Sequence, residues 1–199
     1  MARETAEARN IVKVPEADRR RAIETIVMAF GADPVIRWFY PEPWRYLNHY
    51  GDFVETFGGQ AFTEGSAWTL GDFGATAIWL SPASKLDDDA IVSHLESTVA
   101  PENLRDLLEV LGQMDAGHPP VPHWYLAWLG VDAAMQRRGL GDELISQCLQ
   151  VIDTDHAPAY LDNTNPLNVP FYERHGFRVT GESQAGACPP LIGMLRDAR

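Results

Sequence analysis

Residues 124–152 constrain the fold most, because they join an apolar strand to an amphipathic helix through a short turn rich in arginine and glycine. Residues 124–131 read WYLAWLGV, an apolar run of strand length, and residues 140–152 repeat apolar side chains at helical spacing. Glycines at positions 139 and 141 let backbone N–H groups approach a ligand, and a helix N-terminus attracts anions. The segment therefore predicts a strand, an anion-binding turn and a helix.

Three kinds of phosphate-binding turn share this outline. A P-loop requires Gly-Lys-Ser/Thr at the helix start, whereas Gly141 is followed by Asp142 and Glu143, whose charges repel phosphate. A dinucleotide fingerprint requires a third glycine where this chain has Leu144. The remaining pattern, Gln-x-x-Gly-x-Gly after an apolar strand, resembles the pyrophosphate loop of the GNAT superfamily of N-acetyltransferases. A turn that only packs the helix on the strand is the structural alternative.

A second motif follows at residues 160–177, which read YLDNTNPLNVPFYERHGF. It places a strand, an asparagine-rich turn and a short helix carrying Tyr172 before His-Gly-Phe, and it resembles the second GNAT motif. The two motifs occur in the order typical of that family. The sequences WYLAWLGV and NVPFYERHGF are similar to those of the puromycin N-acetyltransferase branch. The resemblance covers residues 123–179, and the N-terminal half matches only in the order of its elements.

The rest of the chain alternates strands and helices without a repeat, a low-complexity tract or a long linker, so we expect one domain over residues 1–199. We expect strands at 11–14, 66–70, 75–80, 124–131, 159–161, 177–180 and 191–195, and helices at 18–30, 46–57, within 87–114, at 140–152 and at 169–175. This order predicts an α/β fold with a central, mixed, mostly antiparallel sheet flanked by helices. The resemblance implies the same fold.

The composition limits the partners. Sixteen Lys and Arg against 28 Asp and Glu give a net charge of −12, so we expect no nucleic-acid partner and a preference for a cationic ligand. The apolar run at 124–131 is too short to cross a bilayer and the N-terminus is charged, so we expect a cytoplasmic protein without a membrane partner. Cys148 and Cys188 match no metal-ligand spacing, and His118 and His123 lack further ligands nearby, so we expect no metal. A homodimer is compatible with the sequence.

The resemblance implies acetyl-CoA as co-substrate and assigns its binding residues. The end of the strand around Leu129 and Val131 is expected to be distorted and to pair with pantetheine through backbone groups. The pyrophosphate would be held by backbone N–H groups of Arg137, Arg138, Gly139, Leu140 and Gly141. The side chains of the two arginines would reach the CoA phosphates or solvent. Asn165 and Asn168 both fall near the pantetheine-binding asparagine of the family, and we prefer Asn168.

The resemblance also implies catalytic roles. Tyr172 matches the general acid that protonates the CoA thiolate, and a phenol suits this task because its ordinary pKa of about 10 lies near that of a thiol. No motif identifies the base that takes the proton of the amine. Asp162 is the first candidate, because it ends the strand opposite Leu129 where the splayed strands should meet the acetyl group. Glu64 and Asp72 are weaker candidates.

The acceptor site is not set by the family. The aromatic tract that contains Trp38 and Trp44 can receive an aromatic or cationic small molecule by stacking, and packing between helices is the alternative. We predict an acetyl-CoA-dependent N-acetyltransferase in which the amine of a small molecule attacks the thioester directly. The alternative function is a non-catalytic acyl-CoA-binding or sensor protein of the same fold, which would have no need of an acid at Tyr172.

Overall fold

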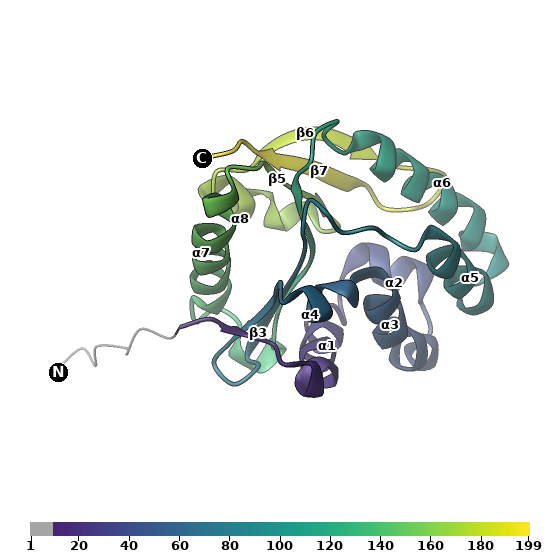
Figure 1. Cartoon of the computed structure of the whole chain (residues 1–199). Coiled ribbons are helices and arrows are strands. Elements are labelled where there is room, and N and C mark those ends of the chain that lie inside the picture. The colour runs from purple at the N-terminus through teal and green to yellow at the C-terminus, as the bar shows by residue number, and fades with distance from the viewer. Residues whose placement is uncertain (1–9) are drawn as a thin grey trace.

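A single sheet of seven strands organises the computed structural model, which describes residues 10–199 (Figure 1). The strands are β1 (Val12–Lys13), β2 (Ala67–Leu70), β3 (Ala75–Leu80), β4 (Trp124–Val131), β5 (Ala159–Asn163), β6 (Arg178–Ser183) and β7 (Leu191–Arg196), in the spatial order β1-β2-β3-β4-β5-β7-β6. Neighbouring strands are antiparallel except for β4 and β5, which are parallel. The predicted α/β fold with a mixed, mostly antiparallel sheet is confirmed.

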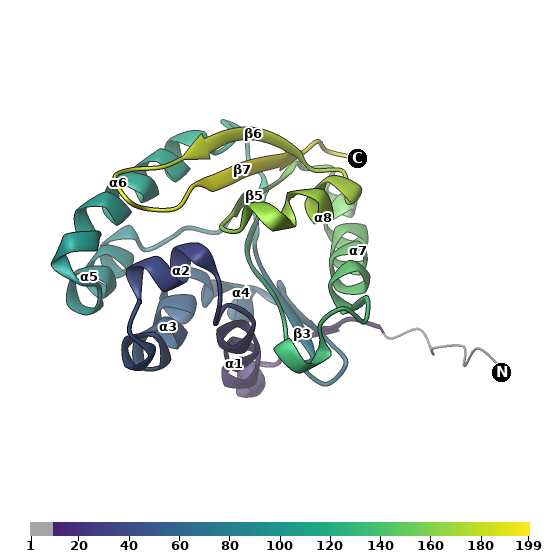
Figure 2. The same cartoon turned by 180° about the vertical axis from the view of Figure 1, so that it is seen from behind.

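Helices cover both faces of this sheet (Figures 1 and 2). The buried side chains of α7 (Leu140–Ile152) and Tyr172 of α8 (Val169–Arg174) belong to the core on one face. The core on the other face contains side chains of α1 (Arg19–Ala29), α2 (Pro34–Phe39), α3 (Pro43–Gly58), α4 (Gln60–Glu64), α5 (Asp88–Thr98) and α6 (Pro101–Gly117). Short 3₁₀ turns lie at Glu16–Asp18, Ala133–Met135, Asp153–Asp155 and Pro166–Asn168. The two cores hold the sheet between unequal helical layers.

Several helix boundaries differ from the sequence expectations. The region within 87–114 is two helices, because residues 99 and 100 are extended and Pro101 starts a new helix that continues to Gly117. The helix expected at 46–57 begins earlier, at Pro43. Helices α2 and α4 were not predicted. The start of α2 is explained by Asp33, whose side chain accepts from the N–H groups of Val35 and Ile36 while Pro34 occupies the first turn.

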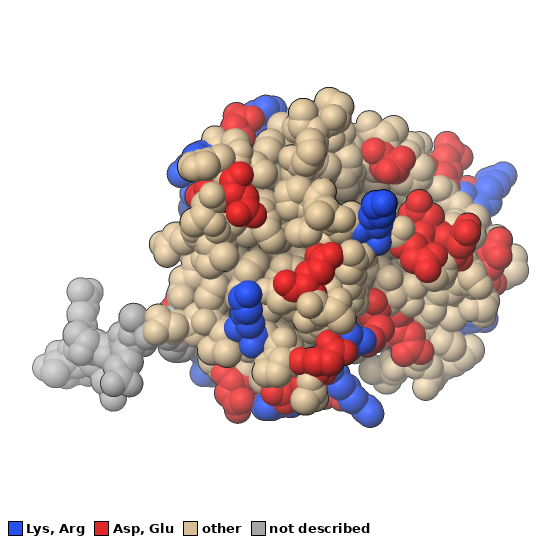
Figure 3. All heavy atoms as spheres, viewed as in Figure 1, with Lys and Arg blue, Asp and Glu red and all other residues tan. Residues whose placement is uncertain are grey.

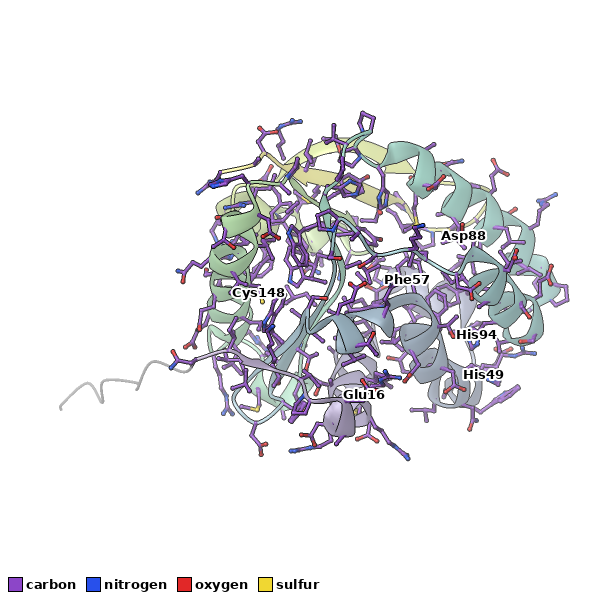
Figure 4. The ribbon with its side chains drawn as sticks, viewed as in Figure 1. Glu16, His49, Phe57, Asp88, His94 and Cys148 are labelled. Atoms are coloured by element: carbon purple, nitrogen blue, oxygen red, sulfur yellow. The ribbon has the colours of Figure 1, made fainter. Side chains whose placement is uncertain are left out.

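Acidic side chains and the two cysteines lie in different parts of the structure. Carboxylates gather over α5 and α6 on the face shown in Figure 3. Cys148 and Cys188 are both buried and free, and Cys148 lies on α7 (Figure 4). No helix within residues 10–199 combines the length and the apolar character needed to span a membrane.

Candidate active site

A cleft opens where the parallel strands β4 and β5 part. The two strands pair only at Trp124 and Tyr125 of β4. The pairing of β4 with β3 then skips Ala127, which is a β-bulge that bends the strand. Because β4 turns away, its edge facing β5 is left without strand pairing from Leu126 onward in the described chain. The distortion that we expected around Leu129 begins just before it.

The cleft has a volume of about 540 Å³. Its walls are the end of α1 with the following loop, β4, the turn at 136–142, the end of β5 and the loop leading into α8. Figure 2 shows α1 and α2 on one side of β5 and α8 on the other. Of the residues expected to bind acetyl-CoA, those that border the cleft are Leu129, Val131, Arg137, Gly139, Leu140, Gly141, Asn165 and Asn168. Arg138 is exposed and lies outside the lining.

The turn before α7 has the backbone that an anion site needs. Gly139 precedes the first residue of α7 with a φ of 80°, and an added Cβ there would meet no atom within 4 Å. Arg137 also has a positive φ, of 61°. Open space therefore borders the residue before α7, and no side chain caps the first N–H groups of the helix. Asp142, whose charge would oppose phosphate, contacts His175 at 3.1 Å and Arg174 at 3.4 Å.

Tyr172 borders the same cleft from α8 and is only 8% exposed. Its ring packs against Phe171 and Phe177, with ring centroids 5.0 and 6.0 Å apart. Burial raises the pKa of the Tyr172 phenol, and the negative charge of Asp33 raises it further. The phenol is therefore protonated at neutral pH and can act as a proton donor.

The two asparagines of the preceding loop differ in their bonding. Asn165 accepts from the N–H of Leu167 at 3.1 Å, which closes the turn before α8. Asn168 precedes the first residue of α8, and its side chain makes no capping bond. The side chain of Asn168 is therefore freer than that of Asn165 to contact a ligand.

Asp33 is a cleft residue that was not predicted from the sequence. It lies in the loop between α1 and α2 and is 8% exposed. Its Oδ1 accepts from the N–H groups of Val35 and Ile36 at 3.0 and 3.1 Å, and its Oδ2 accepts from the hydroxyl of Thr164 at 2.6 Å. Burial raises the pKa of Asp33, and these three hydrogen bonds oppose that rise. The Asp-Pro pair at 33 and 34 was the available signal, because it is typical of a helix start.

Asp162 lies at the base of the cleft, where β4 and β5 part, but its side chain is only 1% exposed. Its two oxygens accept from the hydroxyls of Tyr125 and Tyr160, each at 3.3 Å. His118 Nε2 lies 3.5 Å from Oδ2, and the other ring nitrogen of His118 lies 3.0 Å from His123. These contacts link both strands to the connector before β4. The role of Asp162 as a base stays a prediction, and the burial and hydrogen bonds of its carboxylate disfavour that role.

The two weaker base candidates lie elsewhere. Glu64 accepts from the hydroxyl of Ser84 at 2.5 Å, and Asp72 pairs with Arg21 at 2.9 Å. Neither carboxylate borders the cleft.

The tryptophans expected in the acceptor wall also lie outside the cleft lining. Trp38 is half-buried on α2, and its carbonyl accepts from Asn103 of α6. Trp44 is 56% exposed on the first turn of α3, with its ring 6.1 Å from that of His49. Figure 4 labels His49 and also His94, on the facing helix α5. The structure does not bring either tryptophan to Tyr172.

Comparison with known proteins agrees with this architecture. Residues 112–196 match the family described as the acetyltransferase (GNAT) domain. An uncharacterized N-acetyltransferase of Schizosaccharomyces pombe is 24% identical over 179 residues, which cover 83% of this chain and 72% of that protein.

Solved structures resemble the whole chain at low identity. An acetyltransferase from Corynebacterium glutamicum, described as histone acetyltransferase HPA2 and related acetyltransferase, is 19% identical with a TM-score of 0.67, over 96% of this chain and 97% of its own. An agmatine N-acetyltransferase is 13% identical (TM-score 0.67, 95% and 98% covered), and arylalkylamine N-acetyltransferase 2 from Aedes aegypti is 12% identical (TM-score 0.66, 96% and 99% covered). Residues 112–196 thus match the acetyltransferase (GNAT) domain, and the chain as a whole shares its fold with solved acetyltransferases.

Proposed function

We propose that the protein transfers the acetyl group of acetyl-CoA to the amine of a small molecule. One observation carries the proposal: a buried carboxylate, Asp33, and a buried phenol, Tyr172, border the same cleft. They lie near enough that the charge of Asp33 raises the pKa of Tyr172. A carboxylate suits an incoming ammonium group, and a neutral phenol suits a departing thiolate.

Acetyl-CoA fits the part of the cleft lined by β4, the turn before α7 and α8. The open backbone at Gly139 and the uncapped N-terminus of α7 would hold the pyrophosphate. Arg137 adds positive charge at the same turn. The unpaired edge of β4 beyond Leu126 would bind the pantetheine amides as a neighbouring strand would, and Asn168 would add a side-chain contact.

The amine fits the part of the cleft beside α1. Phe30 and Trp128 both border the cleft, and their rings meet edge to face with centroids 5.6 Å apart. An apolar aromatic wall beside a carboxylate favours an ammonium group carried on an apolar or aromatic body. Two of the structural relatives are named as N-acetyltransferases of amines, one of agmatine and one of arylalkylamines. The sequence resemblance to puromycin N-acetyltransferases supports the same class of amine.

The residues of this chain account for the proton transfers in the reaction. The Asp33 carboxylate binds the ammonium group and takes one proton, which leaves a lone pair on nitrogen. The nitrogen attacks the thioester carbon, and a backbone N–H of β4 stabilises the oxyanion. After the attack the nitrogen carries a positive charge, and it releases a second proton to solvent. When the carbon–sulfur bond breaks, Tyr172 donates its proton to the sulfur. The products are the acetylated amine and CoA, and solvent restores the proton to Tyr172 and accepts the one held by Asp33.

A screen of amines for release of the CoA thiol tests this proposal. The screen should compare aromatic, aliphatic and acidic amines and peptide N-termini, with the wild-type protein and an Asp33→Asn variant side by side. We expect wild-type turnover with amines on apolar bodies and a large loss in the variant. Turnover confined to acidic amines or peptide N-termini, or equal turnover by both proteins, would count against it.

A further inference from the structure

A hydrogen bond joins two loops of the cleft wall that are 131 residues apart in the sequence. The hydroxyl of Thr164, which directly follows β5, donates to Oδ2 of Asp33, which directly precedes α2, at 2.6 Å. We propose that Thr164 is a positioning residue that holds the Asp33 carboxylate ionised and aimed for the incoming amine. This inference rests on the proposed role of Asp33 in binding the amine.

The geometry assigns each Asp33 oxygen its own donors. Oδ1 is held by the N–H groups of Val35 and Ile36, so α2 itself fixes that side of the carboxylate. Oδ2 is held by the hydroxyl of Thr164, at a distance typical of a hydrogen bond to a charged oxygen. Without this hydroxyl, Oδ2 would keep no donor among the hydrogen bonds that Asp33 makes to the described residues. A buried carboxylate that loses a donor binds a proton more readily and is freer to rotate.

The hydroxyl of Thr164 is the side-chain group that most favours the charged form of Asp33. Burial raises the pKa of Asp33, and the hydrogen bond from Thr164 is the largest influence that lowers it. The charge of Asp33 acts on the phenols of Tyr46 and Tyr50 of α3 and Tyr172 of α8. Arg37 of α2 donates its backbone N–H to the carbonyl of Asp33. Burial raises the pKa of all three phenols, so they stay neutral while a carboxylate titrates. Arg37 donates to the carbonyl of Pro41 and lies over the ring of Tyr46.

A pair of substitutions isolates the hydroxyl. Thr164→Val keeps the branched shape and removes the donor, whereas Thr164→Ser keeps the donor and removes a methyl group. Thr180→Val is the matched control, because Thr180 lies on the edge strand β6 and its hydroxyl donates to the carbonyl of Gly193 on β7. A change that appears in Thr164→Val alone is due to the hydroxyl, and a change shared with Thr164→Ser is due to packing.

The first readout needs no catalytic activity. The carboxyl carbon of Asp33 is titrated by NMR in the full-length chain without ligand, and its signal is identified by its loss in Asp33→Asn. We expect the pKa of Asp33 to be higher in Thr164→Val than in the wild type by about one pH unit, since a hydrogen bond to a charged group is lost. Thr164→Ser and Thr180→Val should titrate as the wild type does. An unchanged pKa in Thr164→Val, or an equal rise in Thr164→Ser, would overturn the proposal.

The second readout is the pH dependence of kcat/KM for the amine. The acidic limb should move to higher pH in Thr164→Val by the same shift, with a higher KM for the amine and unchanged affinity for acetyl-CoA. If the wild type acetylates amines and Thr164→Val shows the same limb and KM, the positioning role is overturned while the proposed function stands. If no amine is acetylated but the NMR shift is present, the link from Thr164 to Asp33 stands and the proposed function fails.

Discussion

Replacing Asp33 with asparagine separates the charge of the cleft carboxylate from its structural role. Asparagine caps a helix about as well as aspartate, so the bonds from Val35 and Ile36 should survive. The variant loses the attraction between a carboxylate and an ammonium group, which is worth about 1.5–3 kcal/mol for a hydrogen bond to a charged group. We therefore expect kcat/KM for the amine to fall roughly 10- to 150-fold, and the affinity for acetyl-CoA to stay unchanged.

The same variant should lose activity but not thermal stability. Burial raises the folded-state pKa of Asp33 above its value of about 3.9 in an unfolded chain. The folded state therefore binds the proton more tightly, and this contribution to stability is present at low pH and lost as the pH rises through the folded-state pKa. At pH 7 the ionised side chain costs stability, so Asp33→Asn should unfold at the same temperature as the wild type or higher.

Two measurements on one preparation check this prediction. Thermal unfolding at pH 7 and pH 4 should show that any advantage of Asp33→Asn shrinks at the lower pH, and thiol release should show the loss of activity. A variant that unfolds at a clearly lower temperature but keeps the wild-type kcat/KM would show that Asp33 is a structural cap alone.

Three further predictions concern the rest of the site. Tyr172→Phe should keep the affinity for acetyl-CoA within a few fold and lower kcat by about 10²- to 10⁴-fold if proton transfer limits the rate; an unchanged kcat would remove its role as acid. Gly139→Val should abolish acetyl-CoA binding, measured by calorimetry, because a φ of 80° strains any side chain at this position. Gly141→Val should weaken binding less, because a Cβ there makes ordinary contacts. The reverse order would mean that the pyrophosphate binds elsewhere. Trp44→Ala should leave both the melting temperature and the KM for the amine unchanged, because Trp44 is exposed and lies outside the cleft. A raised KM would indicate that Trp44 contacts the amine.

The parts of the site that could be predicted are those written in short stretches of sequence. The turn around Gly139 lies between a strand and a helix whose periods are plain, and the structure puts an open, positive-φ glycine there. Tyr172 and Asn168 sit in one motif on one short helix and its preceding loop. Local spacing is enough to place such residues at the end of a strand, where the cleft forms.

The acceptor side could not be predicted because it depends on contacts across the fold. Asp33 meets Thr164 only when the first loop folds against the end of β5, and no local pattern encodes that approach. Asp162 follows Tyr160 on the same face of β5, so strand alternation turns its carboxylate toward the two tyrosine hydroxyls. Trp44 lies in an aromatic tract that suggests a binding wall, yet the helix that carries it presents the ring to solvent.

The stoichiometry of acetyl transfer tests the proposed reaction most directly. The wild-type protein is incubated with acetyl-CoA labelled in the acetyl group and with an amine chosen from the screen, and mass spectrometry counts the labelled N-acetyl product against the CoA thiol released. We expect one labelled N-acetyl amine for each CoA, formed only when protein and amine are both present. Thiol release without an acetylated amine, or binding of acetyl-CoA with no release in the presence of any amine, would contradict it.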